Sequence, residues 1–341
     1  MNHFKRISKV FKEAYEISFD NESRIVLMSD CHRGTGDWSD TFLKNQNIYF
    51  SALMNYYENG YTYIELGDGD ELWENKRMND ILEIHNNVFW ILNELYCSGR
   101  FHMIYGNHDM IKKEQKFIKK CLCKCLNREG VRYEPLFKDF CVHEGIILKY
   151  NNSEKKIFLL HGHQGDLLND SLWKLSRFLV RYLWKPLENF GVKDPTRAAK
   201  SYKEKNKVDK RLSEWAVREN VIVIAGHTHR PMFPKPKEVP LEKWPYFNDG
   251  SCVHPRCITA IEIVNGEISL VKWSIKSGKI SNGEENKSER DREKLFITED
   301  NLKCEEFKKY KLEDRSVLYV GKDILGGPED INEYFNRMIK N

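Results

Sequence analysis

Residues 221–229 of the chain read VIVIAGHTH, a short apolar run followed at once by a glycine and two histidines. An apolar run of this length, without alternating polar residues, is typical of a strand that is buried on both faces of a sheet. The stretch therefore predicts a central strand that ends in side chains able to bind a ligand.

The same arrangement occurs four more times along the chain. Apolar runs lie at residues 24–29, 61–66, 101–105 and 156–160. Between the runs, residues 41–59, 78–98 and 110–129 have helical spacing, and Gly130 is a plausible stop for the last helix. Strands that alternate with helices predict an α/β fold with parallel strands.

The second half of the chain has a different pattern. Residues 246–247, 257–264 and 267–274 read as strands joined by tight turns, and Asn265-Gly266 between two of them is a strong hairpin signal. Residues 280–292 are polar and charged, as in a linker. We expect one principal domain over residues 1–278, then a charged linker and a small C-terminal appendage over residues 279–341.

Bulk composition is that of a soluble globular protein. Of 341 residues, 40% are hydrophobic and 31% are charged. No window approaches 18 consecutive apolar residues, so we expect no spanning helix, and the first 18 residues lack the apolar core of a secretory signal. Nine cysteines without a framework pattern favour reduced thiols and a cytoplasmic location. Cys121, Cys123 and Cys125 fall in a predicted helix, where this spacing shares no face.

One segment of the chain is strongly basic. Residues 171–212 hold twelve Lys and Arg against four Asp and Glu, although the whole chain has a net charge of only +4. Such a segment suggests an anionic partner. Within it, one helical stripe is apolar and another is basic. These stripes are Leu172, Leu175, Leu179, Leu183 and Leu187, and Lys174, Arg177, Arg181 and Lys185.

Three interpretations of this segment stay open. The helix covers the sheet and exposes its basic face, or it forms a lid over an anionic, lipid-linked substrate, or it contacts a membrane surface. Nucleic acid is a further possible partner, because basic residues can follow a phosphate backbone and the aromatics Trp173, Phe178, Tyr182 and Trp184 can stack on bases.

Side chains of metal-ligand type follow each of the five buried runs. They are Asp30 and His32, Asp68, Asn107 with His108 and Asp109, His161 and His163, and His227 and His229. Because ligands gather at the carboxyl ends of strands in α/β sheets, we expect one shared site. Imidazoles and carboxylates suit Zn, Fe or Mn. A carboxylate such as Asp68 can bridge two ions, and two ions about 3.5–4 Å apart can activate water for attack on phosphorus.

The order D-x-H, GD, GNHD, H, GHTH between Asp30 and His229 resembles the signature of calcineurin-like metallophosphoesterases. The resemblance implies a four-layer α/β/β/α sandwich of two mixed sheets, here with a helical insertion at about residues 170–215. It also implies a phosphoesterase that uses two divalent metal ions, with Mn²⁺ the first candidate. Residues 246–252 (YFNDGSC) resemble the family element that returns to the site.

The resemblance also implies roles for single residues. One ion would take Asp30, His32, Asp68 and His229, and the other would take Asp68, Asn107, His161 and His227. His108 would be the general acid that protonates the leaving oxygen, oriented by Asp109 or by Glu71. Arg33 and Arg230 adjoin ligands and hold either phosphate oxygens or surface salt bridges. His163 is expected behind the ligands or facing substrate.

The stretches GDGDELW, residues 67–73, and GHTHRP, residues 226–231, look like the branch that contains UDP-2,3-diacylglucosamine pyrophosphatases. That branch also carries a helical insertion, but it often has arginine at the position of His108. We therefore expect a phosphorylated small molecule or a lipid-linked nucleotide sugar as substrate. The alternatives are a nuclease or cyclic-nucleotide phosphodiesterase, and a non-catalytic metal-binding scaffold. Scaffolds usually lose ligands, and none is missing here.

Overall fold

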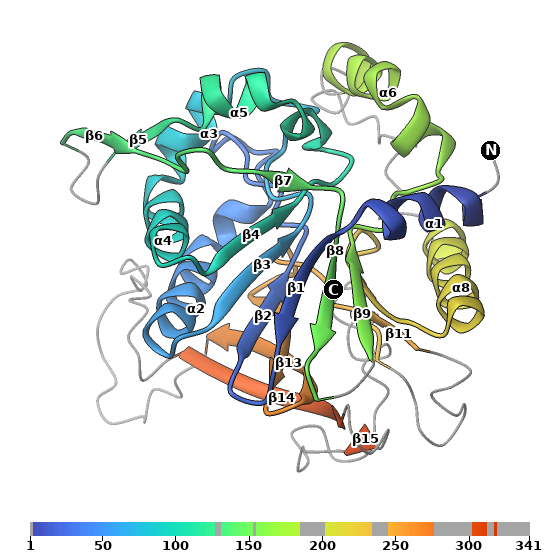
Figure 1. Cartoon of the computed structure of the whole chain (residues 1–341). Coiled ribbons are helices and arrows are strands. Elements are labelled where there is room, and N and C mark those ends of the chain that lie inside the picture. The colour runs from blue at the N-terminus through green and yellow to red at the C-terminus, as the bar shows by residue number, and fades with distance from the viewer. Residues whose placement is uncertain are drawn as a thin grey trace, which may run out of the picture.

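A computed structural model describes residues 3–126, 131–152, 155–184, 202–233, 245–275, 302–311 and 317–318 of the chain. Two mixed β-sheets lie face to face, and helices cover both outer faces (Figure 1). Among the described residues, no helix is both long enough and apolar enough to cross a membrane.

The first sheet has the strand order β1-β8-β9-β10-β11. Its strands are β1 (Tyr15–Phe19), β8 (Gly145–Tyr150), β9 (Lys156–Leu160), β10 (Ile222–Ala225) and β11 (Tyr246–Asn248). β8 and β9 are antiparallel, and the other neighbours are parallel. The parallel pair β9 and β10 brings two of the predicted histidine motifs to the same end of the sheet.

The second sheet has the order β15-β14-β13-β12-β2-β3-β4-β7. Its strands are β2 (Arg24–Met28), β3 (Thr62–Leu66), β4 (Phe101–Ile104), β7 (Val142–His143), β12 (Cys257–Val264), β13 (Glu267–Ile275), β14 (Leu302–Lys311) and β15 (Val317–Leu318). The strands from β2 to β7 are parallel, and those from β12 to β15 are antiparallel. Asn265 and Gly266 have φ of 52° and 70°, as a two-residue hairpin turn requires.

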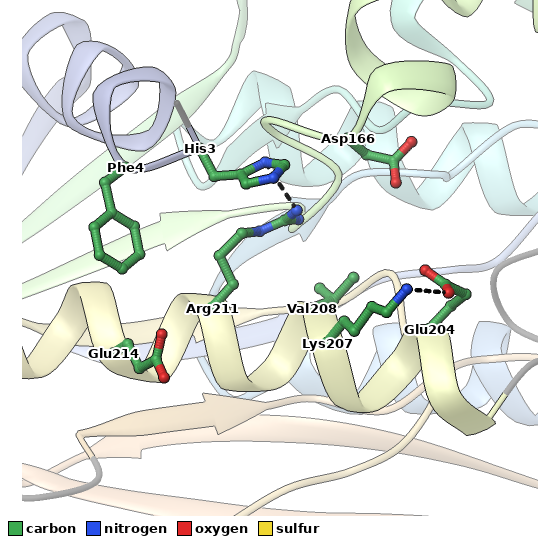
Figure 2. A pocket seen from close by; sticks show the side chains of 8 residues that line it. All are labelled: His3, Phe4, Asp166, Glu204, Lys207, Val208, Arg211 and Glu214. Carbon is green, nitrogen blue, oxygen red and sulfur yellow. Dashed lines mark hydrogen bonds and ion pairs between the residues drawn. The ribbon is translucent and has the colours of Figure 1, made fainter. Parts of the chain in front are cut away.

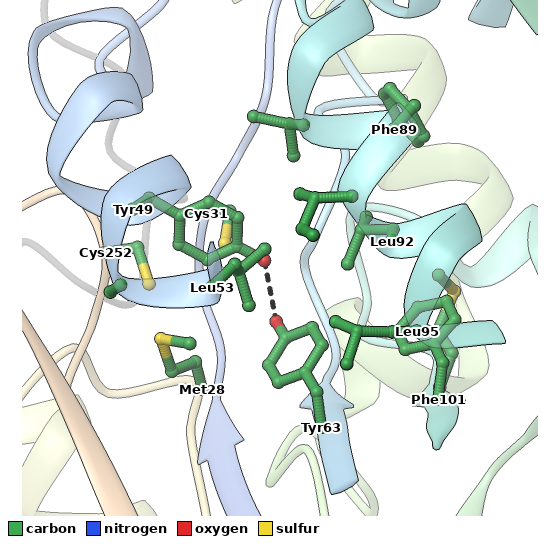
Figure 3. Close-up of a cluster of buried hydrophobic side chains, with 14 of the residues drawn as sticks. Met28, Cys31, Tyr49, Leu53, Tyr63, Phe89, Leu92, Leu95, Phe101 and Cys252 are labelled. Atoms are coloured by element: carbon green, nitrogen blue, oxygen red, sulfur yellow. Dashed lines mark hydrogen bonds between the residues drawn. The ribbon is translucent and has the colours of Figure 1, made fainter. Parts of the chain in front are cut away.

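Side chains alternate between the two faces of each central strand, as a pleated strand dictates. In β2, Ile25 and Leu27 belong to a buried cluster between the sheets, whereas Val26 and Met28 belong to a cluster beneath the helices. Figure 3 shows that helix-side cluster, in which the hydroxyls of Tyr49 and Tyr63 lie 2.7 Å apart. A layer of helices therefore packs on each sheet, and the predicted four-layer sandwich is confirmed.

The helices divide between the two outer faces. α1 (His3–Glu13) and α8 (Tyr202–Glu219) pack on the first sheet. α2 (Gln46–Glu58), α3 (Met78–Ile84) and α4 (Asn86–Cys97) pack on the second. The shorter elements are η1 (Phe42–Lys44), η2 (Met110–Lys113), α5 (Gln115–Cys121), β5 (Lys124–Leu126), β6 (Tyr133–Pro135), η3 (Leu167–Ser171), α6 (Trp173–Leu179) and η4 (Val180–Trp184).

Two predicted helices are shorter than their spacing suggested. The helix expected over residues 78–98 breaks at His85, whose buried ring contacts the carbonyl oxygen of Gly34 at 3.1 Å. The helix expected over residues 110–129 ends at Cys121, because the chain then enters a hairpin in which β5 pairs with β6. Gly130, its expected stop, lies outside the described residues, as does the side chain of Cys125. β1 and β8 were not predicted.

The C-terminal part differs from the predicted appendage. β14 pairs with β13 along its whole length and extends the eight-stranded sheet. Residues 302–311 therefore belong to the sandwich, because they satisfy the backbone hydrogen-bonding groups of an edge strand. Apart from these residues and 317–318, the predicted linker and appendage lie outside the described residues.

Candidate metal centre

The five predicted motifs meet where the two sheets present the carboxyl ends of their parallel strands. The loops are tied to one another by backbone groups. Asp30 N–H donates to the carbonyl oxygen of Gly67 at 3.1 Å, and Gly226 N–H donates to that of His161 at 3.0 Å. His227 N–H donates to Asp30 Oδ2 at 2.8 Å, which joins the two sheets directly.

Left-handed backbone conformations are concentrated in these loops. Asp30, His32, Asp68, His227 and His229 have φ between 49° and 69°. Residues with a side chain rarely adopt this region, and each instance costs on the order of 1–3 kcal/mol. The surrounding hydrogen bonds hold the strained loops in place. The strain lowers the stability of the fold, but the loops fix the directions of these five side chains.

Gly67 shows how closely the loops approach. Its φ is +97°, and an added Cβ would lie 2.7 Å from both Gly106 N and His161 Nδ1. A side chain at position 67 would therefore push apart the loops that carry Asp68 and Asn107.

One group of side chains gathers Asp30, His32 and His229 within 4.8 Å of one another. His229 Nε2 lies 3.1 Å from Asp30 Oδ1 and 3.2 Å from His32 Nε2. Three ligand atoms that converge in this way form one face of a coordination shell for a divalent ion.

A second group gathers Asp68, His161 and His227. His161 Nδ1 contacts the carbonyl oxygen of Leu66 at 2.8 Å, which fixes the ring and presents Nε2 to Asp68 Oδ2 at 3.1 Å. Asp68 Oδ2 also lies 3.8 Å from His32 Nε2 of the first group. Asp68 therefore faces both groups, as a bridging carboxylate must.

Unpaired buried atoms test whether metal ions fit. Asn107 Oδ1 and His227 Nε2 are buried without a hydrogen-bond partner among the described residues, and Asp30 Oδ1 and His161 Nε2, which form no hydrogen bond there either, each lie 3.1 Å from another ligand atom. Each buried polar atom left without a partner costs about 1–3 kcal/mol. Divalent cations bound by these atoms would remove that cost, so the residues present fit two ions.

Electrostatic interactions and burial shift the pKa values of the same side chains. Although burial opposes ionisation, His229 holds the pKa of Asp30 well below its usual value, and His161 does the same for Asp68. Burial and the neighbouring His161 lower the pKa of His227 to about 3. Ionised carboxylates and a neutral imidazole are the protonation states that metal binding needs. At His161, burial lowers the pKa but Asp68 raises it to about 9, so a metal ion would have to displace a proton there.

His108 lies against His32 of the first group, with ring centroids 4.7 Å apart, and is held from two sides. Its Nδ1 is 2.8 Å from Glu71 Oε2, and its ring stacks on Trp73 with centroids 4.4 Å apart. Glu71 also contacts His32 Nδ1 at 3.0 Å. His108, His32, Asp68 and other residues line a cavity of about 190 Å³. Because the Glu71 carboxylate accepts a hydrogen bond from Nδ1–H, His108 has Nε2 left for chemistry in this cavity.

Comparison with known proteins agrees with this geometry. The family model described as "Calcineurin-like phosphoesterase" matches residues 23–231. The chain belongs to this family. The structure of vacuolar protein sorting 29 from Cryptosporidium parvum is similar at 11% sequence identity and a TM-score of 0.37, over 84% of this chain and 97% of that one. No curated protein sequence matches.

The role predicted for Asp109 in this calcineurin-like phosphoesterase needs correction. Asp109 Oδ1 accepts a hydrogen bond from Gly106 N–H at 2.7 Å, and Oδ2 accepts from Gly69 N–H at 3.1 Å and from Lys112 Nζ at 2.8 Å. The carboxylate thus joins two ligand loops. Of the two orienting candidates left open by the sequence, the one at His108 is Glu71.

Arg33 also differs from expectation, because its side chain is wholly buried. Its guanidinium pairs with Glu65 at 2.8 Å and with Asp70 at 2.6 Å, and Lys112 pairs with Asp70 from the other side. A charge removed from solvent in this way cannot hold substrate, and its ion pairs are buried rather than on the surface. Removing one partner of such pairs typically costs about 3–5 kcal/mol, so the network supports the ligand loops.

Arg230 and His163 were predicted to contact substrate. Arg230 forms an ion pair with Asp209 of α8, and its role toward substrate stays a prediction. His163 is wholly buried behind the ligands, with its ring centroid 5.5 Å from that of His161, and it does not line the cavity. It groups with Glu144 and Asp170, but Arg6 already pairs with both carboxylates. The substrate-facing alternative for His163 is therefore corrected.

The helical insertion is oriented differently from what its leucine stripe predicts. Trp173, Ser176 and Val180 are buried, whereas Leu172 and Leu175 are 41% and 51% exposed. Leu172, Leu175 and Leu183 of the stripe are therefore exposed, Leu179 is half-buried, and Leu187 and Lys185 lie outside the described residues. π-helical turns at both ends of α6 change the number of residues per turn, so regular helical spacing does not describe this segment.

A larger cavity of about 500 Å³ lies between α1 and α8 (Figure 2), and none of the proposed ligands lines it. Charges of both signs line it: Lys207 pairs with Glu204 at 2.6 Å, and Arg211 Nη1 lies 3.3 Å from His3 Nδ1. None of the potential metal-binding groups found in the described residues includes a residue of this cavity. The smaller cavity beside His108 is therefore the candidate active site.

Proposed function

We propose that the chain hydrolyses a phosphoester or pyrophosphate bond with two bound divalent ions, Mn²⁺ being the first candidate. The supporting observation is a pair of ligand groups linked through Asp68, whose Oδ2 lies 3.8 Å from His32 of the other group, with Asn107 Oδ1 and His227 Nε2 buried without a hydrogen-bond partner among the described residues. Ions bound there would supply an activated water and polarise the phosphoryl group. The residues that would hold them are Asp30, His32, Asp68 and His229, and Asp68, Asn107, His161 and His227.

Protein side chains supply the proton for the leaving group. His108 donates from Nε2 to the leaving oxygen, because its Nδ1 is held by Glu71. The Glu71 carboxylate is kept ionised: burial opposes its charge, but His108 and His32 lower its pKa well below the usual value. Trp73 fixes the plane of the His108 ring by stacking on it. Orientation of this kind is what a general acid needs to act at every turnover.

For the substrate class we propose a phosphate or pyrophosphate ester that carries acyl chains at an anionic lipid surface. The support is an apolar outer face on the insertion, whose residues are 41–64% exposed. This outer face consists of Leu167, Leu168, Leu172, Leu175, Phe178, Tyr182 and Leu183. The exposed Lys174 lies on the same helix, and apolar side chains next to basic ones suit such surfaces. Nucleic acid stays the alternative: of the aromatics that could stack on bases, Trp173 is buried, whereas Phe178 and Tyr182 are exposed.

A metal-supplemented substrate screen tests both parts of the proposal. Mono-, di- and pyrophosphate esters are offered with and without acyl chains in anionic vesicles, each with Mn²⁺ or EDTA. We expect hydrolysis only with metal, and a kcat/KM about tenfold or more higher for the acyl-bearing ester, since burying a few methylenes contributes roughly 1.4 kcal/mol or more. Phe178→Ser should reduce that preference, and Val217→Ser, at an exposed position on α8, should not.

Equal kcat/KM for esters with and without acyl chains would contradict the substrate class but leave the reaction intact. Stoichiometric metal binding without hydrolysis of any ester would contradict the reaction itself and favour a scaffold.

A further inference from the structure

Arg181 of the insertion holds a loop of the main domain through three backbone oxygens. Its Nε donates to the carbonyl of Trp73 at 3.0 Å, and its Nη2 donates to those of Leu72 and Asn75 at 2.6 Å and 3.0 Å. The guanidinium is a rigid planar fork, so three oxygens bound to it have fixed relative positions.

That loop carries the two side chains that contact His108, namely Glu71 and Trp73. The loop is a tight turn. Asn75 donates from N–H and from Nδ2 to the carbonyl oxygen of Glu71, at 3.2 Å and 3.0 Å, and Trp73 N–H donates to Glu71 Oε1 at 3.2 Å. Because the turn is internally braced, a force on its outward carbonyls moves Glu71 and Trp73 together.

Apolar packing supports the same contact. Trp73 shares one buried cluster with Tyr105 and Met110 of the main domain and with Trp173 and Val180 of the insertion. Val180 directly precedes Arg181 in the chain. The insertion thus packs against Trp73, and its Arg181 binds the backbone of the loop.

We propose that Arg181 is a positioning residue for the general acid. It fixes the loop of residues 71–75, and through Glu71 and Trp73 it sets the place and tilt of the His108 ring. The inference rests on the proposed function in one respect, that His108 donates a proton to the leaving group. Small displacements of such a group reduce the rate steeply.

The neighbouring Arg177 supplies a matched control. It lies about one helical turn before Arg181 and carries the same charge, but its guanidinium lies 4.8 Å from the centroid of the Trp173 ring. No hydrogen bond from Arg177 to the loop is found among the described residues. Arg177→Met therefore removes an arginine from the insertion without releasing the three carbonyls.

Leaving-group dependence separates positioning from general damage. Two water-soluble esters without acyl chains are used, one with a 4-nitrophenyl and one with an alkyl leaving group. Only the poor alkyl leaving group needs to be protonated by a general acid as it departs. For Arg181→Met we expect kcat on the alkyl ester to fall roughly 10- to 100-fold, with a much smaller change on the nitrophenyl ester. Arg181→Lys should restore part of the loss, and Arg177→Met should behave as wild type.

A second readout follows the ring itself. Stacking on Trp73 displaces the NMR signal of the His108 Cε1–H group, which is assigned by its disappearance in His108→Gln. We expect this signal to move toward that of an exposed histidine in Arg181→Met and to stay in place in Arg177→Met. Should Arg181→Met fail to fold, Arg181→Lys is measured in the same two ways, with an intermediate effect expected.

Equal loss on both esters, or an unmoved His108 signal in folded Arg181 variants, would overturn the assignment of Arg181. If His108→Gln lowered kcat equally on the alkyl and the nitrophenyl ester, that result would count against the proposed function instead. In that case the NMR signal still decides whether Arg181 holds the ring.

Discussion

Replacing Asp68 by asparagine is expected to lower kcat/KM by about 10³-fold or more. Asp68 Oδ2 faces His161 at 3.1 Å and His32 at 3.8 Å, so one carboxylate serves both ligand groups. Asparagine keeps the size of the side chain but removes its negative charge. Two divalent ions that stabilise a transition state by several kcal/mol cannot be held as a pair without it, and roughly 4 kcal/mol corresponds to 10³ in rate.

Metal content and turnover are measured together on the purified variant. We expect Asp68→Asn to bind fewer ions per chain than wild type under the same metal concentration. Glu83→Gln removes an exposed carboxylate of α3 and should change neither quantity. Wild-type turnover in Asp68→Asn would show that the two groups do not act as one centre.

Replacing His108 by alanine should produce the second largest effect, and one of a different kind. General acid catalysis contributes about 10²–10⁴-fold, and His108 is held for that role by Glu71 and Trp73. We expect kcat to fall by this factor on alkyl phosphoesters and by a much smaller factor on 4-nitrophenyl esters. The bound metal should stay at its wild-type level if His108 is the acid, whereas a loss of metal would assign it as a ligand, since it also forms a potential metal-binding group with His32 and Glu71.

A histidine distant from the cavity gives the control. The ring of His143 stacks on Tyr15 with centroids 4.5 Å apart, and His143→Gln should leave both esters unaffected. If His108→Ala loses activity equally on good and poor leaving groups, His108 is a structural residue or a ligand rather than the acid.

The ligand set could be predicted from the sequence because each member is a local feature. Asp30 follows the apolar run of β2, and His161 follows that of β9. Parallel strands bring their carboxyl ends to one edge, so residues that each directly follow a strand in the sequence lie close together in the structure. The continuous apolar runs of these strands likewise predicted two covered faces, and both are present.

Roles that depend on tertiary contacts could not be predicted in this way. Asp109 and Glu71 are both acidic, but only Asp109 adjoins His108 in the sequence, and Glu71 lies 37 positions before it. Only the fold places Glu71 at the ring and turns Asp109 toward backbone N–H groups of two loops. Arg33 adjoins a ligand, but strand β3 and the loop after it supply Glu65 and Asp70 as its buried partners.

The insertion illustrates a further limit of periodicity. Regular spacing identified its leucine stripe as apolar, but spacing does not say which element lies opposite a stripe. Trp173 and Val180 pack against Trp73 of the main domain, and Leu172, Leu175 and Leu183 are left exposed. The larger aromatic side chain buries more apolar surface than a leucine does, which favours this orientation.

The most direct measurement is the metal dependence of turnover in chelator-treated protein. Mn²⁺ is added back in steps, and ions bound per chain are counted beside the rate of phosphoester hydrolysis. The account predicts no turnover in the stripped protein and a rate that reaches its maximum as the second ion per chain is bound. Full turnover in the stripped protein, or a maximum already reached with one ion per chain, would contradict a two-metal centre built on Asp68.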